Sequence, residues 1–394
     1  MYVTRPLSMY KRNPAALSQT PPPGPNSGYL VIMDEETETY NCFGLCKDSV
    51  IRDLPFPQNK NLAVNYITQH NNPTDTHSTV THSTDALFVP VLDQPLSSNR
   101  YYVIRRKGKY KGKAITSSRE DDMETCLCCS FAQDVKPRPL DLSDEYQQVE
   151  IIKRSHGFHA KSVAADGIPP EFLRRKGWKI DANTNYDYHL DAASGLNESL
   201  RTQLPDFNFP LSNNQSESVI VGKWYCPFMF VKEGMRLKDQ MKKSVFYKLT
   251  LEQRWEKVFS KENSSSGEVA FFVDVVIETD VAKVAGSDVV CDENDVQERV
   301  LWFKSFDEKG AEKSVGLSLE IVERMKWEQE RVGWIGGNDK QVRLERVEEF
   351  GGNNMWKYFS CYVLVESFVL KRMDGNLVLT YDYRHTHQIT CRWE

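Results

Sequence analysis

The strongest folding signal in the sequence is the Asp374-Gly375 pair, which lies between two strand-like runs. The run at 356–370 is densely apolar, and the run at 377–393 alternates between apolar and polar residues. An Asp-Gly pair between two such runs is typical of a tight β-hairpin turn. The sequence therefore predicts one long hairpin over the last 40 residues.

The predicted register of this hairpin gathers three polar side chains on an otherwise apolar face. A two-residue or a four-residue loop gives the same register, in which the numbers of each facing pair have a constant sum. The predicted pairs are Leu370 with Leu379, Phe368 with Tyr381, Glu366 with Tyr383, Leu364 with His385, Tyr362 with His387 and Trp356 with Trp393. Because an unpaired polar group on an apolar face is costly, Glu366, His385 and His387 are the best candidate site in the sequence.

Two imidazoles and one carboxylate suit zinc or non-haem iron, and neighbouring antiparallel strands can bring such ligands within coordination distance. One hypothesis is therefore a metal site at Glu366, His385 and His387, with no other cofactor expected. The alternative is that neighbours satisfy each polar group, Glu366 through Tyr383 or His385 and His387 through Tyr362.

At 394 residues and 45.4 kDa, the chain exceeds the size of a comfortable single core, so two domains are expected. Runs rich in valine, isoleucine, tyrosine and phenylalanine predict strands on both sides of a polar stretch. The predicted fold class is α+β, dominated by antiparallel β-sheet, with few short helices. The expected organisation is an amino-terminal arm with a proline-rich stretch at 1–27, a first β-rich domain at 28–180, a polar linker at 181–217 and a second β-rich domain at 218–394.

Three further stretches carry local predictions. The stretch 319–332 fits a strand by alternation and a helix by its charge ladder, and helix propensity decides for the helix. A short helix is expected after Ile168-Pro169-Pro170, because proline suits the first helical turn. The polar stretch 69–85, in which Thr-His-Ser-Thr occurs twice, predicts a mobile loop.

A basic run follows the predicted strand at 101–106. Such a run can bind phosphate groups or act as a nuclear address. The acidic residues at 120–124 follow closely, so local neutralisation is the alternative. The candidate polyanion-binding residues are Arg105, Arg106, Lys107, Lys109, Lys111 and Lys113.

Nine cysteines without an apolar leader sequence indicate reduced thiols in the cytoplasm, with the nucleus as the alternative, and no secretion is expected. No window approaches the roughly 20 apolar residues of a transmembrane helix. Five cysteines would form a thiolate site only if the strands of the first domain brought them together, and their spacing favours free thiols. S-acylation is a third interpretation. These five are Cys42, Cys46, Cys126, Cys128 and Cys129.

The sequence gives little support for catalysis. It has neither a Gly-x-Ser-x-Gly elbow nor a phosphate-binding loop, and Cys226 between Tyr225 and Pro227 is typical of a packing residue. A net charge of −5 gives no general attraction to nucleic acid. We therefore expect a non-catalytic binding or interaction module with an anionic ligand or a protein partner, and a metal-dependent enzyme is the alternative.

Several long motifs resemble a plant-specific family of uncharacterised proteins, the domain of unknown function 1262. The motifs lie at 1–8, 21–31, 54–61, 168–173 and 222–231 and in the final hairpin. The resemblance implies a plant source and brings no known activity, cofactor or catalytic residue. Some members carry the label of insecticidal crystal toxin, so a membrane-active protein is the second alternative. Pore-forming hairpins alternate small polar with apolar residues, and the large aromatic residues of the final hairpin disfavour that role.

Overall fold

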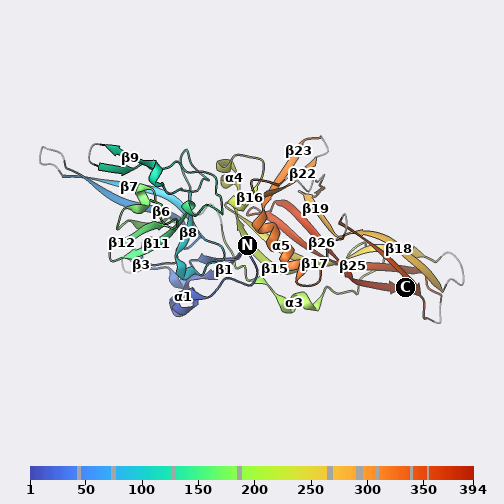
Figure 1. The fold of residues 1–394 in the computed structure, drawn as a ribbon. Coiled ribbons are helices and arrows are strands. Elements are labelled where there is room, and N and C mark those ends of the chain that lie inside the picture. Colours follow the sequence, from blue (N-terminus) through green and yellow to red (C-terminus); the bar gives the residue numbers. More distant parts are fainter. Residues whose placement is uncertain are drawn as a thin grey trace. The chain divides into compact units, whose positions relative to one another are not determined.

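The computed structural model describes residues 1–41, 46–71, 77–126, 129–183, 189–263, 269–289, 296–306, 310–337, 340–352 and 355–394. Strands make up 49% and helices 16%, which confirms the predicted fold dominated by antiparallel sheet with few short helices. The chain forms two compact units (Figure 1). Unit 1 comprises Met1–Ala193, Pro227–Met229 and Met235–Phe246, and unit 2 comprises Ser194–Cys226, Phe230–Gly234 and Tyr247–Glu394.

Unit 1 is built on a seven-stranded antiparallel sheet. Its apolar face packs around Phe56 and Trp178, both fully buried, and the Trp178 indole donates a hydrogen bond to the Leu173 carbonyl at 2.8 Å. Burial of these aromatic side chains is the main stabilising contribution of such a core. In spatial order the strands are β12 (Gly157–Ser162), β11 (Gln148–Arg154), β8 (Arg100–Arg105), β7 (His77–Pro90), β6 (Asn61–Asn71), β13 (Lys179–Asn183) and β5 (Val50–Ile51).

The amino-terminal segment is an integral part of unit 1. Strand β1 (Tyr2–Pro6) pairs in parallel with β2 (Gly28–Ile32), and the buried Tyr2 hydroxyl donates a hydrogen bond to the Pro90 carbonyl at 2.8 Å. Helix α1 (Leu7–Arg12) and the 3-10 helix η1 (Pro14–Ser18) follow β1 directly. The predicted arm is therefore docked on its own unit.

The prediction of a mobile loop at 69–85 is wrong for residues 69–71, which belong to β6, and for residues 77–85; residues 72–76 lie outside the described part of the chain. Residues 77–85 belong to β7, which pairs with β6 from Leu62 opposite Ala86 to Asn71 opposite His77. Threonine is a good strand former, but a ribbon that is polar on both faces lacks the apolar alternation by which strands are recognised.

Unit 2 is centred on the final hairpin. Here β25 (Tyr358–Arg372) pairs with β26 (Leu377–Trp393), and the turn between them needs Gly375 because its φ is +87°. The hairpin prediction is confirmed, as is the predicted register from Leu370 to Leu364. The other strands of this sheet in unit 2 are β14 (Gly195–Leu196), β15 (Val219–Pro227), β17 (Phe246–Glu262), β19 (Asp280–Val284) and β20 (Ser287–Asp288).

Beyond Leu364 the predicted register is wrong. Leu364 faces His385, whereas Val363 faces Ile389, so β26 contains three extra residues at 386–388. Tyr362 therefore faces Thr390 instead of His387, and Trp393 faces Phe359 instead of Trp356. The sequence does not predict this bulge. The stretch His385-Thr386-His387-Gln388 contains no apolar residue whose position would indicate which face of the strand is buried.

Smaller elements complete unit 2. Helix α5 (Leu319–Glu330) confirms the helical prediction for this stretch. Strand β18 (Ala270–Glu278) pairs with β24 (Gln341–Glu349) as a separate antiparallel ribbon. A four-stranded sheet contains β16 (Val231–Lys232), β23 (Glu312–Ser318), β22 (Val300–Phe306) and β21 (Val296–Gln297).

The remaining elements are short. The expected helix after the proline pair is α2 (Glu171–Arg174). Among the helices that the structure describes, none combines the length and the apolar composition needed to cross a bilayer. The others are η2 (Glu35–Thr37), β3 (Tyr40–Asn41), β4 (Cys46–Lys47), η3 (Leu96–Ser98), η4 (Glu120–Asp122), β9 (Met123–Cys126), β10 (Cys129–Ala132), η5 (Glu145–Gln147), α3 (Glu198–Gln203), η6 (Phe228–Phe230) and α4 (Leu237–Lys243).

Candidate ligand-binding site

Unit 1 contains a cavity of about 340 Å³. Its walls come from α1, η1, the strand β5 and the segment that follows β5. This volume lies in the range of small-molecule sites, which are typically apolar with a few fixed polar groups. The apolar lining residues are Leu7, Tyr10, Pro14, Leu17, Met33, Val50, Ile51, Leu54, Pro55 and Ala182.

Asp34 fixes the helical wall of the cavity. One of its carboxylate oxygens accepts a hydrogen bond from the Ser8 amide at 3.2 Å and another from the Thr37 hydroxyl at 2.9 Å. Burial alone would raise the pKa of Asp34, but these hydrogen bonds outweigh it and lower the pKa below its ordinary value. The first turn of α1 is thereby tied to η2, and both elements contribute side chains to the cavity.

A charged group of three side chains also lines the cavity. One carboxylate oxygen of Glu38 accepts a hydrogen bond from the Lys60 ammonium at 3.0 Å. The other oxygen lies 2.6 Å from the Lys47 ammonium nitrogen. Burial opposes ionisation of Glu38, but the hydrogen bonds from both lysines hold its pKa below the ordinary value. Glu38 therefore stays a carboxylate and keeps two ammonium groups in fixed positions.

The cavity lining carries a surplus of positive charge. Its cations are Lys11, Lys47, Arg52 and Lys60, and its anions are Glu38, Asp48 and Asp53, which leaves one formal positive charge. Arg52 is paired with Asp48 at 2.6 Å. Within the described residues, the Lys11 ammonium donates a long hydrogen bond, 3.5 Å to the Thr37 carbonyl. A ligand with one anionic group would complement this lining.

Sequence reasoning missed this site because its residues come from segments between Leu7 and Ala182 that share no local pattern. The available signals were two of the motifs noted for their resemblance to a family, at 1–8, which contains the lining residue Leu7, and at 54–61. Leu54, Pro55 and Lys60 of the second motif line the cavity.

The structure brings Glu366 and His385 together, but it gives Glu366 a partner that no pattern indicated. The Arg201 guanidinium donates to both carboxylate oxygens, at 2.8 Å for the bond from Nε, and the Gln253 amide adds a third hydrogen bond at 2.8 Å. His385 Nε2 lies 3.8 Å from Glu366 and 2.9 Å from the Gln329 side-chain oxygen. Burial raises the pKa of Glu366, but the nearby His385 and the Arg201 guanidinium outweigh it and lower this pKa to about 2.

His387 lies in the bulge of β26 and is exposed. Its ring centre is 5.4 Å from that of His385, and partial burial together with His385 lowers its pKa. The alternative interpretation is closer to the observed contacts of Glu366, because its carboxylate is satisfied by neighbours, though mainly by Arg201. Binding of zinc or iron by Glu366, His385 and His387 stays a prediction.

The basic run occupies the turn after β8, where its side chains have different surroundings. Arg106 is buried, and the Arg105 guanidinium lies over the Phe172 ring at 5.4 Å from its centre. Lys107 is exposed but pairs with Asp85 at 3.0 Å. Part of this charge is therefore already compensated, by Asp85 in place of the acids at 120–124, and polyanion binding by the run stays a prediction.

Replacement of Lys107, Lys109, Lys111 and Lys113 by serine tests this prediction. If the run binds phosphates, the wild type should bind nucleic acid or phosphoinositide vesicles with a log-log salt slope of about −0.7 to −0.9 per phosphate neutralised, and the variant should lose this binding. Serine replacement of the exposed Lys238, Lys242 and Lys243 of α4 is the matched control and should leave binding intact. Equal losses in both variants, or no salt-sensitive binding by the wild type, would contradict the prediction.

The cysteine predictions have unequal outcomes. Cys42 and Cys128, and the side chains of Cys46, Cys126 and Cys129, lie outside the described part of the chain. Cys226 is fully buried, and this burial raises the pKa of its thiol to about 11, as expected of a packing residue.

Comparison with known proteins supports the family resemblance. Residues 23–130 match the family described as "Protein of unknown function (DUF1262)". This DUF1262 segment contains the cavity residues from Met33 to Lys60 and the whole basic run. It confirms the resemblance over that segment.

The chain was also compared with curated protein sequences and with solved structures. No curated protein sequence shows significant similarity to this chain. Among solved structures, the crystal structure of Cry35Ab1 is similar with 9% sequence identity and a TM-score of 0.47, over 86% of this chain and 90% of that chain. A similarity of this size supports no statement about what this chain does.

Proposed function

We propose that this protein is a non-catalytic binding module that holds a small, mainly apolar ligand with one anionic group in the cavity of unit 1. The observation that carries the proposal is the combination of an apolar lining with a surplus positive charge in a cavity of about 340 Å³. Apolar walls supply affinity by burial, and a fixed charge selects the orientation of the ligand.

The lysine arrangement supports an anionic group on the ligand. Glu38 holds the Lys47 and Lys60 ammonium groups in fixed positions in the cavity lining. Lys11 adds a further ammonium whose long hydrogen bond costs little to replace. Among the described residues, those that line the cavity include no histidine and no cysteine, the side chains most often used for proton transfer and nucleophilic attack. A binding role therefore fits this lining better than a catalytic one.

Displacement of a fluorescent anilinonaphthalene sulfonate probe by decanoate tests the proposal. Leu17→Trp should abolish binding of both compounds because the indole fills the cavity that Leu17 lines. Ile335→Trp is the matched control, since this residue of unit 2 is 74% exposed and an indole there changes no cavity lining. Equal binding by the wild type and by Leu17→Trp would show that the probe lies elsewhere and would contradict the proposal.

The role of charge is tested by comparing decanoate with decanol. Lys11→Gln should weaken decanoate binding by about tenfold, the value of one charged hydrogen bond, and leave decanol binding unchanged. Arg12→Gln is the control, because the adjacent Arg12 pairs with Glu36 on the surface and does not line the cavity. If decanol binds the wild type as tightly as decanoate, the anionic part of the proposal is wrong.

The two alternatives drawn from the sequence, a metal-dependent enzyme and a membrane-active protein, stay untested. No contact in the described residues favours either over the binding module.

A further inference from the structure

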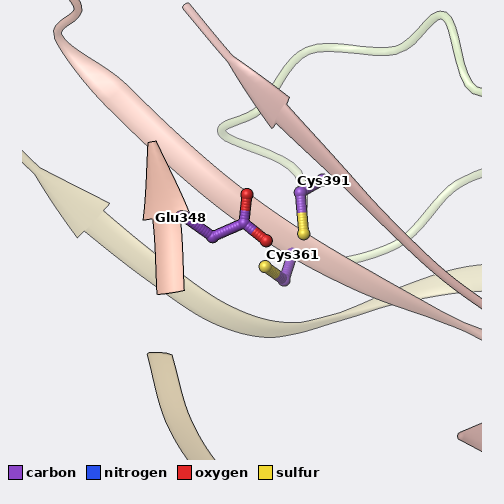
Figure 2. Close-up of side chains that lie close together, drawn as sticks. All are labelled: Glu348, Cys361 and Cys391. Atoms are coloured by element: carbon purple, nitrogen blue, oxygen red, sulfur yellow. The ribbon is translucent and has the colours of Figure 1, made fainter. Parts of the chain in front are cut away.

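Three potential metal ligands from three different strands converge in unit 2. They are Glu348 of β24, Cys361 of β25 and Cys391 of β26 (Figure 2). One carboxylate oxygen and the two sulfur atoms all lie within 4.8 Å of one another. Both cysteines are free thiols. This group is separate from Glu366, His385 and His387 and from the cavity of unit 1.

The strand register explains why the two sulfur atoms meet. Cys361 faces Cys391 across β25 and β26. Tyr358 and Glu394 exchange both of their backbone hydrogen bonds, at 3.0 and 2.9 Å. Hydrogen-bonded and non-hydrogen-bonded pairs alternate along an antiparallel ladder, so the cysteine pair, three steps further on, occupies a non-hydrogen-bonded position. Facing side chains are closest at such positions.

The β18–β24 ribbon supplies the carboxylate. Glu348 faces the buried Phe271 in this ribbon, and Phe271 belongs to the same core cluster as Cys361 and Phe359. Glu348 is therefore only 9% exposed, and Figure 2 shows its carboxylate directed toward the two sulfur atoms. The Arg346 guanidinium, two residues earlier on the same strand, forms an ion pair with Glu348.

The electrostatics of this group disfavour thiolates unless a cation is present. The hydrogen bond with Cys391, burial and the charge of Glu348 together raise the pKa of the Cys361 thiol far above its ordinary value. A bound cation reverses the effect, because its charge stabilises thiolate and carboxylate together.

We propose that Glu348, Cys361 and Cys391 bind one zinc ion, or another thiophilic divalent cation of the same preference. Two thiolates and one carboxylate are three of the four ligands of a tetrahedral zinc site, and the fourth position is left to water or an external ligand. Their three negative charges are balanced by the two charges of zinc and the one of Arg346. Zinc–sulfur bonds of about 2.3 Å and zinc–oxygen bonds of about 2.0–2.2 Å place ligand atoms less than about 4 Å apart, so modest side-chain rotations close the site.

Cadmium titration of the reduced, full-length protein tests the proposal through the ultraviolet absorption of cadmium–thiolate bonds. Cys361→Ser should bind one cadmium ion fewer than the wild type. Cys226→Ser is the matched control, because Cys226 is also a buried free thiol of unit 2 but has no place in the group, and its stoichiometry should be unchanged. Using the same readout, affinity should rise with pH, because metal binding releases the thiol protons.

Glu348→Gln gives a second, independent variant that keeps the size of the side chain. It should weaken binding of zinc and cadmium by at least about tenfold, a loss that even the removal of an outer-shell partner can cause. If Cys361→Ser fails to fold by circular dichroism, the affinity of Glu348→Gln decides the question. Unchanged affinity in Glu348→Gln, or a cadmium stoichiometry of Cys361→Ser equal to that of Cys226→Ser, would overturn the proposal.

The competing use of a facing thiol pair is a reversible disulfide. Peptide mapping of air-oxidised protein would reveal a Cys361–Cys391 bond. If that bond forms readily while the reduced protein binds neither zinc nor cadmium at these residues, the group is a redox pair and the zinc proposal is wrong. Protection of both thiols from alkylation by added zinc would support the proposal.

Discussion

Replacement of Arg201 by methionine is expected to destabilise the protein by about 3–5 kcal/mol, the usual cost of leaving a buried charge without its partner. The Arg201 and Glu366 side chains are only 4% and 2% exposed, so water cannot take the place of the lost guanidinium. The change in the free energy of unfolding is measured by urea denaturation followed by tryptophan fluorescence and circular dichroism.

Arg201 also belongs to a wider network at helix α5, which increases the expected effect. Its guanidinium lies 3.6 Å from the Glu328 carboxylate and donates to the Glu328 carbonyl at 3.0 Å. The Glu328 carboxylate in turn accepts hydrogen bonds from the Arg324 guanidinium at 2.6 Å and from the Arg331 guanidinium at 2.8 Å. Loss of Arg201 would therefore leave two carboxylates with fewer partners in a buried region.

A surface pair offers the matched control for this substitution. Arg343 binds Asp274 with two hydrogen bonds of 2.8 and 2.6 Å, but both side chains are exposed. Arg343→Met should leave the unfolding midpoint nearly unchanged, because solvent screens such pairs. The double variant Arg201→Met, Glu366→Leu should recover part of the loss, since it removes the orphaned charge as well. Equal effects of Arg201→Met and Arg343→Met would contradict the burial argument.

The free energy of unfolding should also fall in acid by about 3 kcal/mol through Glu366 alone. Arg201 and His385 lower the pKa of this carboxyl from 4.5 to about 2 in the folded protein. A group whose pKa is lower in the folded state stabilises that state above its unfolded pKa, and the contribution disappears as the pH falls through the folded pKa. The loss should therefore occur as the pH falls from about 4.5 to about 2.

Urea denaturation at a series of pH values measures this dependence. The double variant Arg201→Met, Glu366→Leu lacks the carboxyl group and should show a shallower dependence over the same range. An identical dependence in both proteins would assign the acid sensitivity to other carboxylates.

Zinc and iron analysis of the purified wild type and of His385→Ala tests the predicted metal site at Glu366, His385 and His387, because that prediction requires bound metal that is lost in the variant.

The elements that the sequence predicted correctly are those marked by turn residues, apolar runs or helix propensity within a short stretch of the chain. The Asp374-Gly375 turn and the apolar runs around it were enough for the hairpin and for the pairs as far as Leu364 with His385. Helix propensity decided the assignment of α5 correctly. The polar ribbon of β6 and β7 was missed because the usual apolar alternation is absent there.

The functional groups were harder to predict because each depends on residues far apart in the chain. Arg201 reaches Glu366 across 165 positions, and nothing near Arg201 in the sequence indicates that contact. With the constant register expected for the hairpin, Cys391 would have faced Tyr358. The three extra residues of the bulge in β26 move it opposite Cys361 instead, so the thiol pair depends on an irregularity that carries no sequence signal.

The division of the chain between the two units imposes an order on events at the ribosome. Unit 1 also includes Pro227–Met229 and Met235–Phe246, and both segments are synthesised after Ser194–Cys226 of unit 2. The core cluster around Phe56 and Trp178 lies wholly within residues 51–182, so a nascent chain of 193 residues already contains this cluster but lacks the two later segments of unit 1. Ser194–Cys226 contains β15, which pairs with β17, and β17 in turn pairs with the final hairpin, so the sheet of unit 2 is complete only once β25 and β26 have been translated.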